Sequence, residues 1–271
     1  MQKGDNGEIK VTDIYIGTAG YSYEDWEGPF YPEGVKTGGQ KIQHYLNFFN
    51  TVEIDSSFYK ILSPGYFWFL IKNTSKEFLI NLKMHQEITH FRGESFKKTK
   101  NDFFKSIDPL LKTERQFLVL FQFPYAFKYN LENLEYLRKI TLEFDIPKVI
   151  EFRHESWNKK EVYQQLQSQN FILSLVDTPN LKGLFPSNVN EVTADSGYIR
   201  FHGRNAAKWW KPEKAYERYN YEYTNEEINK EIKKRILQLV KKTRRLVVIF
   251  NNHYQAKAVR NAIKLIEALK S

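Results

Sequence analysis

The chain has 271 residues, 41% of them hydrophobic, so it is long enough to bury one large core or two smaller ones. It contains no cysteine, which excludes a disulfide framework and a thiolate zinc site and suits a reducing cytoplasm. The net charge of +9 favours anionic partners, nucleic acid among them, without choosing one.

Targeting and membrane signals are absent from the sequence. The opening residues MQKGDNGEIK lack the apolar run of a signal peptide, and the longest purely apolar run, residues 66–71, is too short to cross a bilayer. Much of the positive charge falls in residues 226–245, which we interpret as a solvated helix face. We therefore expect a cytoplasmic protein that does not bind a membrane; the sequence carries no signal for an oligomeric state.

Eight short apolar segments have the character of buried strands, and most become polar toward their ends. In chain order they are residues 14–20, 51–56, 78–85, 117–124, 148–154, 171–177, 197–203 and 245–253. Successive side chains of a strand point to opposite faces, so Glu151 and Arg153 share one face. Because an ion pair on a hydrophobic strand is costly to bury alone, we expect other polar side chains to converge there.

Segments with helical periodicity lie between the strands. Ser63-Pro64 and Asn130 have the character of helix starts, Ser156 is predicted to start a short helix, and Thr224 with Glu227 has the spacing of a capping box. Pro109 is expected to bend or break the helix over residues 95–112. Residues 178–196 have little helical periodicity and are predicted to be mostly loop.

The alternation of strand and helix predicts parallel strands with crossover helices. Eight such units in a chain of this length predict a single (β/α)8 barrel domain over residues 1–271, and no polar linker divides it. An open doubly wound sheet is the alternative, which eight nearly regular units disfavour.

Polar residues at the strand ends of a closed barrel point into the mouth at its C-terminal face, where active sites of this fold lie. The predicted mouth residues are Thr18, Glu53, Asp55, Lys83, His85, Gln122, Glu151, Arg153, Asp177, Arg200, His202, Asn251 and His253. A self-satisfied polar network that caps the core is the structural alternative. The clustering of polar groups at one end of the strands favours a functional site.

Three chemistries fit these residue types. Acid–base catalysis would use the carboxylates, with Lys83 and Arg153 holding their charge states apart. Anion recognition would use Lys83, Arg153 and Arg200, because arginine offers a bidentate fork to phosphate. A divalent metal, manganese or zinc, is the less favoured candidate cofactor; its ligands would be Glu53, Glu151, Asp177, His202 and His253.

Two long loops that follow strands combine aromatic and basic residues. Residues 20–40 include Tyr21, and residues 204–223 include Trp209 and Trp210 among several lysines. Aromatic rings stack on nucleobases or sugar faces, while lysine and arginine contact phosphates. Packing onto the barrel is the alternative for any single ring. We expect the loop over residues 204–223 to cover part of the mouth.

Several motifs, taken in order, resemble the uncharacterised YecE-like family, also known as domain of unknown function 72. They are Gly17-Thr18-Ala19-Gly20-Tyr21, TVEIDSSFY from Thr51, Lys83 with Ile88-Thr89-His90, LFQFP from Leu120, EFRHESW from Glu151, Arg200-x-His202-Gly203 and FNNH from Phe250. The resemblance implies a (β/α)8 barrel similar to the xylose-isomerase-like barrels, which include metal-dependent apurinic endonucleases. It brings no established activity.

Two positions depart from the family's pattern. Asp55 stands where asparagine is more common, which adds a negative charge to the mouth. Ala256 and Lys257 follow FNNH in a region where a glycine is common, which disfavours an anion-binding turn there.

The leading functional hypothesis is an enzyme that acts on a phosphate-bearing substrate, DNA or RNA first, by hydrolysis or lyase chemistry. Its predicted catalytic residues are Glu53, Glu151, Asp177 and His202. Its predicted substrate contacts are Thr18, Tyr21, Asp55, Lys83, His85, Gln122, Arg153, Arg200, Trp209, Trp210, Asn251 and His253. The alternatives are a sugar or sugar-phosphate converting enzyme and a non-catalytic nucleic-acid-binding barrel.

Overall fold

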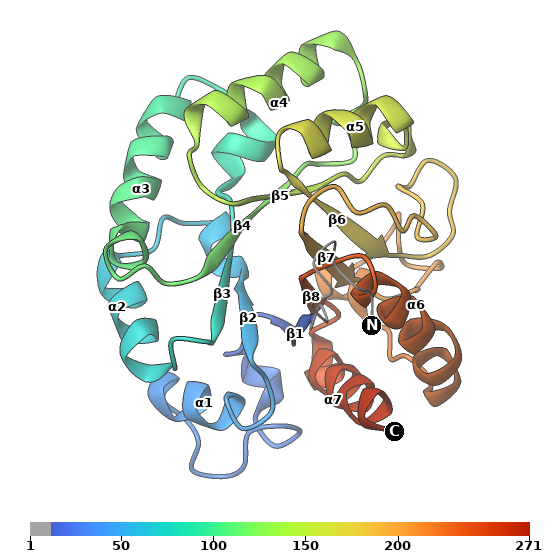
Figure 1. The fold of residues 1–271 in the computed structure, drawn as a ribbon. Helices are drawn as coiled ribbons and strands as arrows, with labels where there is room; N and C mark the ends of the chain where they lie inside the picture. Colours follow the sequence, from blue (N-terminus) through green and yellow to red (C-terminus); the bar gives the residue numbers. More distant parts are fainter. Residues whose placement is uncertain (1–11) are drawn as a thin grey trace, which may run out of the picture.

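The computed structural model describes residues 12–271, which form a closed barrel of eight parallel strands (Figure 1). The strands follow one another around the barrel in sequence order, and β8 pairs with β1 to close it. Their bounds are β1 Asp13–Ala19, β2 Thr51–Ile54, β3 Leu79–Lys83, β4 Phe117–Gln122, β5 Lys148–Glu151, β6 Ile172–Asp177, β7 Ser196–Phe201 and β8 Arg245–Phe250. The predicted (β/α)8 barrel is confirmed, and the open sheet is excluded.

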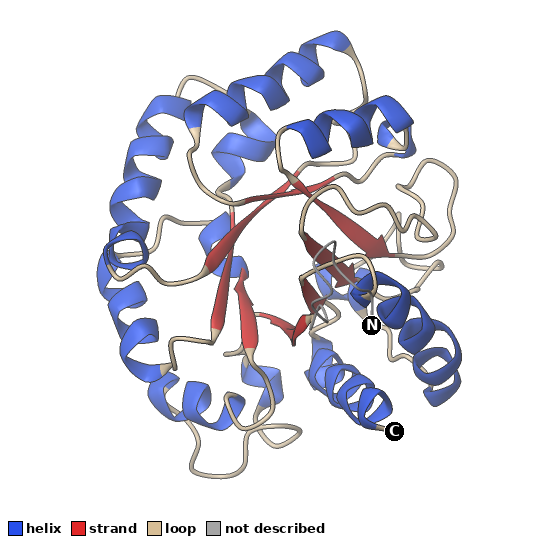
Figure 2. Ribbon diagram, in the orientation of Figure 1, coloured by secondary structure: helices blue, strands red, loops and turns tan. Residues whose placement is uncertain are grey.

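Helices surround the barrel in an outer layer (Figure 2). The α-helices are α1 Gly38–Tyr45, α2 Pro64–Asn73, α3 Phe96–Lys112, α4 Leu131–Glu143, α5 Lys160–Ser168, α6 Lys233–Val240 and α7 Lys257–Lys270. Shorter helical turns are η1 Glu24–Trp26, η2 Asp55–Phe58, η3 Glu87–Phe91, η4 Glu155–Trp157, η5 Ala215–Tyr219, η6 Glu227–Ile232 and η7 Tyr254–Ala256. The described chain has no helix between β6 and β7, so the loop predicted there is confirmed.

The helix starts follow local capping chemistry. Asn130 accepts a hydrogen bond from the backbone of Asn133, and Thr224 and Glu227 cap each other's backbone N–H groups at 3.1 and 2.8 Å. The helix expected to start at Ser156 begins only at Lys160, after a 3-10 turn, so that start was wrong. Pro109 does not break α3, which continues through it to Lys112.

The strands end a few residues earlier than the sequence suggested, except for β6. After β1 and β7 the chain turns at Gly20 and Gly203, whose φ angles are +75° and +85°. After β2 and β5 it enters a short 3-10 turn. The polar residues that follow the strands are therefore aimed by these turns rather than by sheet pairing.

Two hydrophobic layers lie on either side of the barrel wall. The larger one packs the outward faces of the strands against the helices. The smaller one fills the barrel interior and is formed by Ala19, Leu79, Leu118, Leu120, Val149, Ile172, Tyr198, Val247 and Ile249. The inner layer reaches only part of the way along the axis, so the next inward positions toward the strand ends carry the polar groups of the mouth.

None of the helices within residues 12–271 has both the length and the hydropathy that a membrane span needs. The N-terminal segment in which the sequence shows no signal peptide, residues 1–10, lies outside the described residues.

Candidate active site at the barrel mouth

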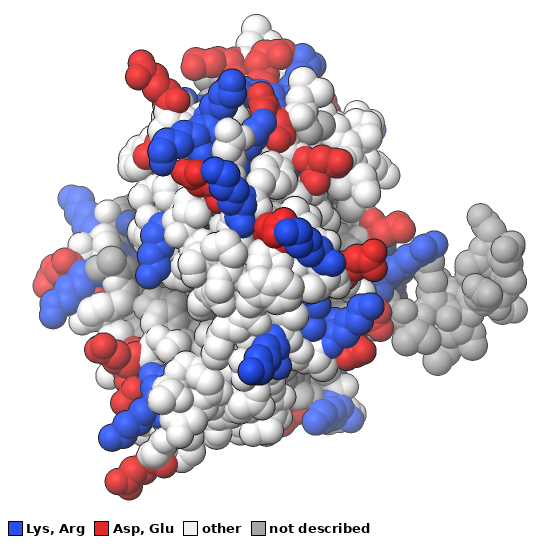
Figure 3. Space-filling model, turned by 90° about the vertical axis from the view of Figure 1, so that its left-hand side faces the viewer, with Lys and Arg blue, Asp and Glu red and all other residues white. Residues whose placement is uncertain are grey.

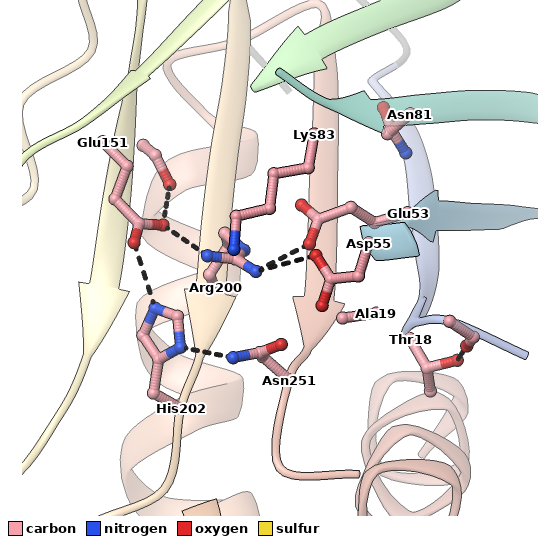
Figure 4. A network of polar contacts seen from close by, with 12 residues as sticks. Thr18, Ala19, Glu53, Asp55, Asn81, Lys83, Glu151, Arg200, His202 and Asn251 are labelled. Atoms are coloured by element: carbon pink, nitrogen blue, oxygen red, sulfur yellow. Dashed lines mark hydrogen bonds and ion pairs between the residues drawn. The ribbon is translucent and has the colours of Figure 1, made fainter. Parts of the chain in front are cut away.

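The centre of the mouth is a buried bridge between two carboxylates (Figure 4). Arg200 Nη2 lies 2.7 Å from Oε1 of Glu53, and its Nη1 lies 2.9 Å from Oε2 of Glu151. The Tyr198 hydroxyl donates to the other oxygen of Glu53 at 2.7 Å. All four side chains are fully buried. They come from β2, β5 and β7, so Arg200 joins strands that are not neighbours in the sheet.

The second oxygen of Glu151 faces two further groups. Arg153 Nε lies 2.7 Å from Oε1, and His202 Nε2 lies 3.5 Å from the same atom. Asn251 Nδ2 donates to His202 Nδ1 at 2.9 Å, which leaves the imidazole proton on Nε2, facing Glu151. Burial, followed by the charge of Arg153, lowers the pKa of His202 to about 3, so its ring is neutral.

The two bridged carboxylates differ in their proton affinity. Burial raises the pKa of Glu53 to about 7, although Arg200 opposes the rise and the nearby Asp55 adds to it. Burial also acts on Glu151, but Arg153 and Arg200 outweigh it and hold the pKa of that carboxyl well below its ordinary value. When the surroundings shift the pKa values of two paired acids in opposite directions, one acid can transfer protons and the other stays charged.

Lys83 and Asp55 complete the charges of the cluster. Asp55 Oδ1 lies 3.8 Å from Arg200 Nη2, and Lys83 extends toward the same group of side chains (Figure 4). The Lys83 ammonium lies 4.2 Å from the ring centroid of Phe58 and has no ion pair within the described chain. Three cations thus balance three carboxylates. When Glu53 takes up a proton the cluster carries one excess positive charge, which favours an anion.

The loop between β7 and η6 lies over the mouth, as predicted. Tyr216 stacks on Tyr254 with centroids 4.1 Å apart, and Trp210 packs against Tyr125 at 4.8 Å. Because Tyr254 follows β8 and Tyr125 follows β4, the loop crosses from one side of the barrel to the other. Within the loop, the ring of Tyr219 lies 6.0 Å from that of His202.

The two tryptophans of this loop have different environments. Trp209 is only 3% exposed and packs against Tyr219, and its backbone oxygen accepts a hydrogen bond from Arg218. Trp210 is 46% exposed. A ligand can therefore reach the ring of Trp210, whereas Trp209 supports the loop from below.

A cavity of about 710 Å³ opens beside the central cluster. Tyr21, Asp55 and His253, three of the predicted substrate-binding residues, line it. Tyr23 stacks on the ring of His253 with an interplanar angle of 3°. The cavity and the charged cluster share Asp55, so they are parts of one site.

Thr18 and Asp177 do not join the cluster, and their predicted position in the mouth is wrong. The Thr18 hydroxyl is hydrogen-bonded to Tyr45 of α1, and Asp177 accepts from the Tyr223 hydroxyl and from Nε and Nη2 of Arg204. Both side chains lie on the outward face of their strands, toward the helices. The reason is the alternation of side chains, because Asp177 shares the face of two buried leucines rather than that of Ser174, which contacts Glu151.

His85 and Gln122 lie at the margin of the site. His85 Nδ1 accepts a hydrogen bond from the backbone of Glu87, and Gln122 donates to the carbonyl of Phe123. Both interactions are local to the loops that follow β3 and β4. Within residues 12–271, neither side chain forms a hydrogen bond or ion pair with the Glu53–Arg200–Glu151 bridge.

The predicted metal ligands do not fit a metal ion. Arg200 already occupies oxygens of Glu53 and Glu151, and Arg204 occupies both oxygens of Asp177. Within residues 12–271 no three histidine, aspartate or glutamate side chains converge closely enough to hold a metal. A metal ion could bind these carboxylates only by displacing an arginine that already pairs with them. The proposed chemistry therefore uses no metal.

Two tyrosines and one histidine belong to the site although the sequence analysis did not include them among the predicted site residues. They are Tyr198, Tyr219 and His90. Tyr198 binds Glu53; its place in the middle of an apolar strand hid it among core residues. His90 lies beside Phe58, and burial, then Lys83 and Arg153, lower its pKa to about 4. Its motif, Ile88-Thr89-His90, was the available signal. Tyr219 lies in the loop over residues 204–223, and its ring is 6.0 Å from that of His202.

Four comparisons place the chain among known proteins. The model of the family described as "Protein of unknown function DUF72" matches residues 15–271. The UPF0759 protein YunF of Bacillus subtilis (strain 168) is 34% identical over 272 residues, covering 94% of each chain. The solved DUF72 family protein TM1631 of Thermotoga maritima MSB8 has a TM-score of 0.86 and 33% identity, covering 96% of this chain and 100% of that one. For EF0366 of Enterococcus faecalis V583 the TM-score is 0.84 with 27% identity, covering 95% and 96%.

Proposed function

The chain belongs to the protein family of unknown function DUF72, and on the chemistry of its own site we propose that it is an enzyme acting on a phosphate-bearing substrate by acid–base chemistry. Glu53 is the proton-transferring group, and Lys83 with Arg153 holds the anion. Glu151 stays charged and keeps Arg153, Arg200 and His202 in position.

One observation carries this proposal: a single buried arginine joins two carboxylates whose pKa values are shifted in opposite directions. A network that served only stability would gain little from a carboxyl that titrates near neutral pH, because replacing buried ions by apolar groups is often neutral or stabilising. Perturbed acids in a barrel mouth are candidates for catalysis.

The substrate class follows from charge and from the loop. A nucleic acid, cleaved by hydrolysis or lyase chemistry, is the first candidate because its phosphates suit Lys83 and Arg153 and Trp210 offers a stacking face. On the side of the barrel seen in Figure 3, Lys and Arg are interspersed with Asp and Glu rather than joined in a basic strip. This face offers no continuous basic strip for a nucleic-acid backbone. We place the phosphate at the mouth because Lys83 and Arg153 lie there.

A sugar phosphate is the second candidate, favoured by the loop that covers the mouth and by the cavity of about 710 Å³ beside it. A covered mouth suits a small molecule or a chain end better than a duplex. A cytoplasmic setting and a single domain over residues 1–271 remain part of the proposal.

The test is calorimetric titration of a 5′-phosphorylated single-stranded oligonucleotide and of inorganic phosphate. Lys83→Met is expected to weaken both by about tenfold, since a charge-assisted hydrogen bond is lost. Lys98→Met is the matched control, because Lys98 pairs with Asp102 on the outer helix α3, 2.9 Å away. Equal affinities for wild type and Lys83→Met would contradict the proposal. Glu53→Gln should keep binding and lose any turnover seen by mass spectrometry of the products.

A further inference from the structure

The cavity beside the charged cluster has the size of a small-molecule site. Its volume of about 710 Å³ lies within the range of about 300–1,000 Å³ that ligand pockets usually have. It is lined by Gly20, Tyr21, Ser22, Tyr23, Gly38, Ile54, Asp55, Ser56, Tyr59, Tyr66, Phe69 and His253. No lysine or arginine is among these described residues, so the cavity is not built to hold an anion.

Two polar atoms of its lining lack partners. Oδ1 of Asp55 and Nδ1 of His253 are buried from solvent, and neither has a hydrogen-bond partner among the described residues. Among the described residues, this oxygen of Asp55 has just one ion pair, the long one with Arg200 Nη2 at 3.8 Å. Buried polar atoms are nearly always hydrogen-bonded, so a ligand that supplies hydroxyl groups would satisfy both.

The histidine is held rigidly in place for such a contact. Its ring stacks on Tyr23 with centroids 4.6 Å apart, and its backbone oxygen accepts from Trp26 Nε1 at 2.8 Å. Neither interaction uses the ring nitrogens. The imidazole is therefore oriented by groups that leave its hydrogen-bonding atoms free for a ligand.

Aromatic rings supply the rest of the wall. Tyr59 is 69% exposed, and Tyr21 and Tyr66 line the same cavity. Aromatic faces next to one carboxylate and one imidazole suit a flat, neutral, hydroxylated ring: its C–H faces pack on tyrosine, and its hydroxyls donate to Asp55. A sugar ring has this chemistry.

We propose that this cavity binds the sugar ring of the substrate, with Asp55 and His253 bonding its hydroxyls while its phosphate lies at Lys83 and Arg153. The assignment rests on the proposed function for the position of the phosphate. Asp55 contacts both parts, which places the ring next to the Glu53–Arg200 pair. The same chemistry occurs in a free sugar phosphate and in a terminal nucleotide.

The test uses a variant that fills the cavity without removing a polar group. Gly38 lines the cavity at the first position of α1, where a Cβ atom would have no neighbour within 4 Å, so Gly38→Phe should fold normally. Gly93→Phe is the matched control, because a Cβ there also meets nothing within 4 Å and Gly93 does not line the cavity. His253→Phe keeps the stacking on Tyr23 and removes the two ring nitrogens.

Four probes are titrated into each protein: inorganic phosphate, ribose 5-phosphate, glucose 6-phosphate and a 5′-phosphorylated trinucleotide. At least one of the last three should bind wild type about tenfold more tightly than inorganic phosphate. Gly38→Phe and His253→Phe should remove that gain, and Gly93→Phe should keep it. A gain confined to the trinucleotide identifies a nucleic-acid end, and a gain with a free sugar phosphate identifies a small substrate.

The outcomes separate the two proposals. If Lys83→Met weakens phosphate binding but the sugar gives no gain, or Gly38→Phe leaves the gain intact, the sugar subsite is wrong and the proposed function stands. If Lys83→Met leaves phosphate binding unchanged while Gly38→Phe still weakens the sugar probes, the proposed anion site is wrong and the sugar subsite stands.

Discussion

Arg200 and Glu53 form an ion pair across the barrel, with 2.7 Å between Nη2 and Oε1 and no exposure of either side chain. They belong to β7 and β2, which do not pair with each other, and they are 147 residues apart in the sequence. The pair therefore forms only after the barrel closes. It also links catalysis to stability, because the group proposed to carry the proton is held by a buried charge.

Removing Glu151 should destabilise the protein strongly. Glu151→Ala leaves Arg200 and Arg153 without their shared carboxylate, and breaking a buried pair typically costs about 3–5 kcal/mol. Chemical denaturation measures the loss. Glu161→Ala is the control, because that side chain is 60% exposed and should change the free energy of unfolding by less than about 0.5 kcal/mol. An unchanged melting temperature of Glu151→Ala would show that the pair contributes nothing.

The pH dependence of stability should reveal Glu53. Its pKa is about 7 in the folded protein against an ordinary 4.5, so the folded state holds the proton in this window and stability falls as pH rises through it. The Glu53→Gln variant has no carboxyl at this position, so its stability does not fall with pH for this reason. Between about pH 5 and pH 7, the free energy of unfolding of the wild type should therefore decline by about 2 kcal/mol relative to the variant.

His202 makes stability depend on pH in the opposite direction, but it is present in both the wild type and Glu53→Gln. Its pKa of about 3 in the folded state means that stability rises with pH up to its ordinary value of 6.5. The comparison of wild type with Glu53→Gln therefore isolates the carboxyl. Parallel curves from denaturation over this pH range would mean that Glu53 is charged throughout.

Tyr219 should ionise more readily than an ordinary phenol. Burial raises its pKa, but Arg153, Lys83, Arg218 and Arg200 outweigh burial, so the pKa lies below the ordinary 10.0. The near-ultraviolet titration of wild type minus Tyr219→Phe should show this ionisation, and Lys83→Met should shift it upward. Tyr59→Phe is the control, because burial, then Asp55 and Tyr219, raise the pKa of Tyr59 above 10.0. A Tyr219 phenol that ionises above this value would contradict the cationic surroundings.

The two loop tryptophans should separate into a structural and a ligand-binding residue. Trp209→Ala removes a buried ring and should lower the free energy of unfolding by about 3 kcal/mol. Trp210→Ala should leave folding nearly unchanged and weaken single-strand binding about tenfold, within the range of about 1–3 kcal/mol for one stacked base. Titration alongside circular dichroism measures both. Unchanged binding by well-folded Trp210→Ala would leave the loop as a cover only.

The sequence predicted the barrel because the number, spacing and order of its apolar and helical segments all favour the same fold. Eight apolar segments, separated by segments with helical periodicity, can bury their faces only as parallel strands covered by helices. The same local rules predicted the caps at Asn130 and Thr224, since a cap depends on residues three positions apart. Strand parity could also have excluded Thr18 and Asp177, because both share a face with apolar neighbours.

The sequence alone also identified most of the charged groups of the mouth. Glu53, Lys83, Glu151 and Arg200 are polar residues at inward strand positions, and Arg153 follows two residues after the end of β5. The sequence could not say which carboxylate each cation would meet. That depends on barrel closure, which sets Arg200 of β7 between Glu53 of β2 and Glu151 of β5. Burial and Coulomb interactions act through space, so only the tertiary structure decided that Glu53 gains a proton near neutral pH while Glu151 stays charged.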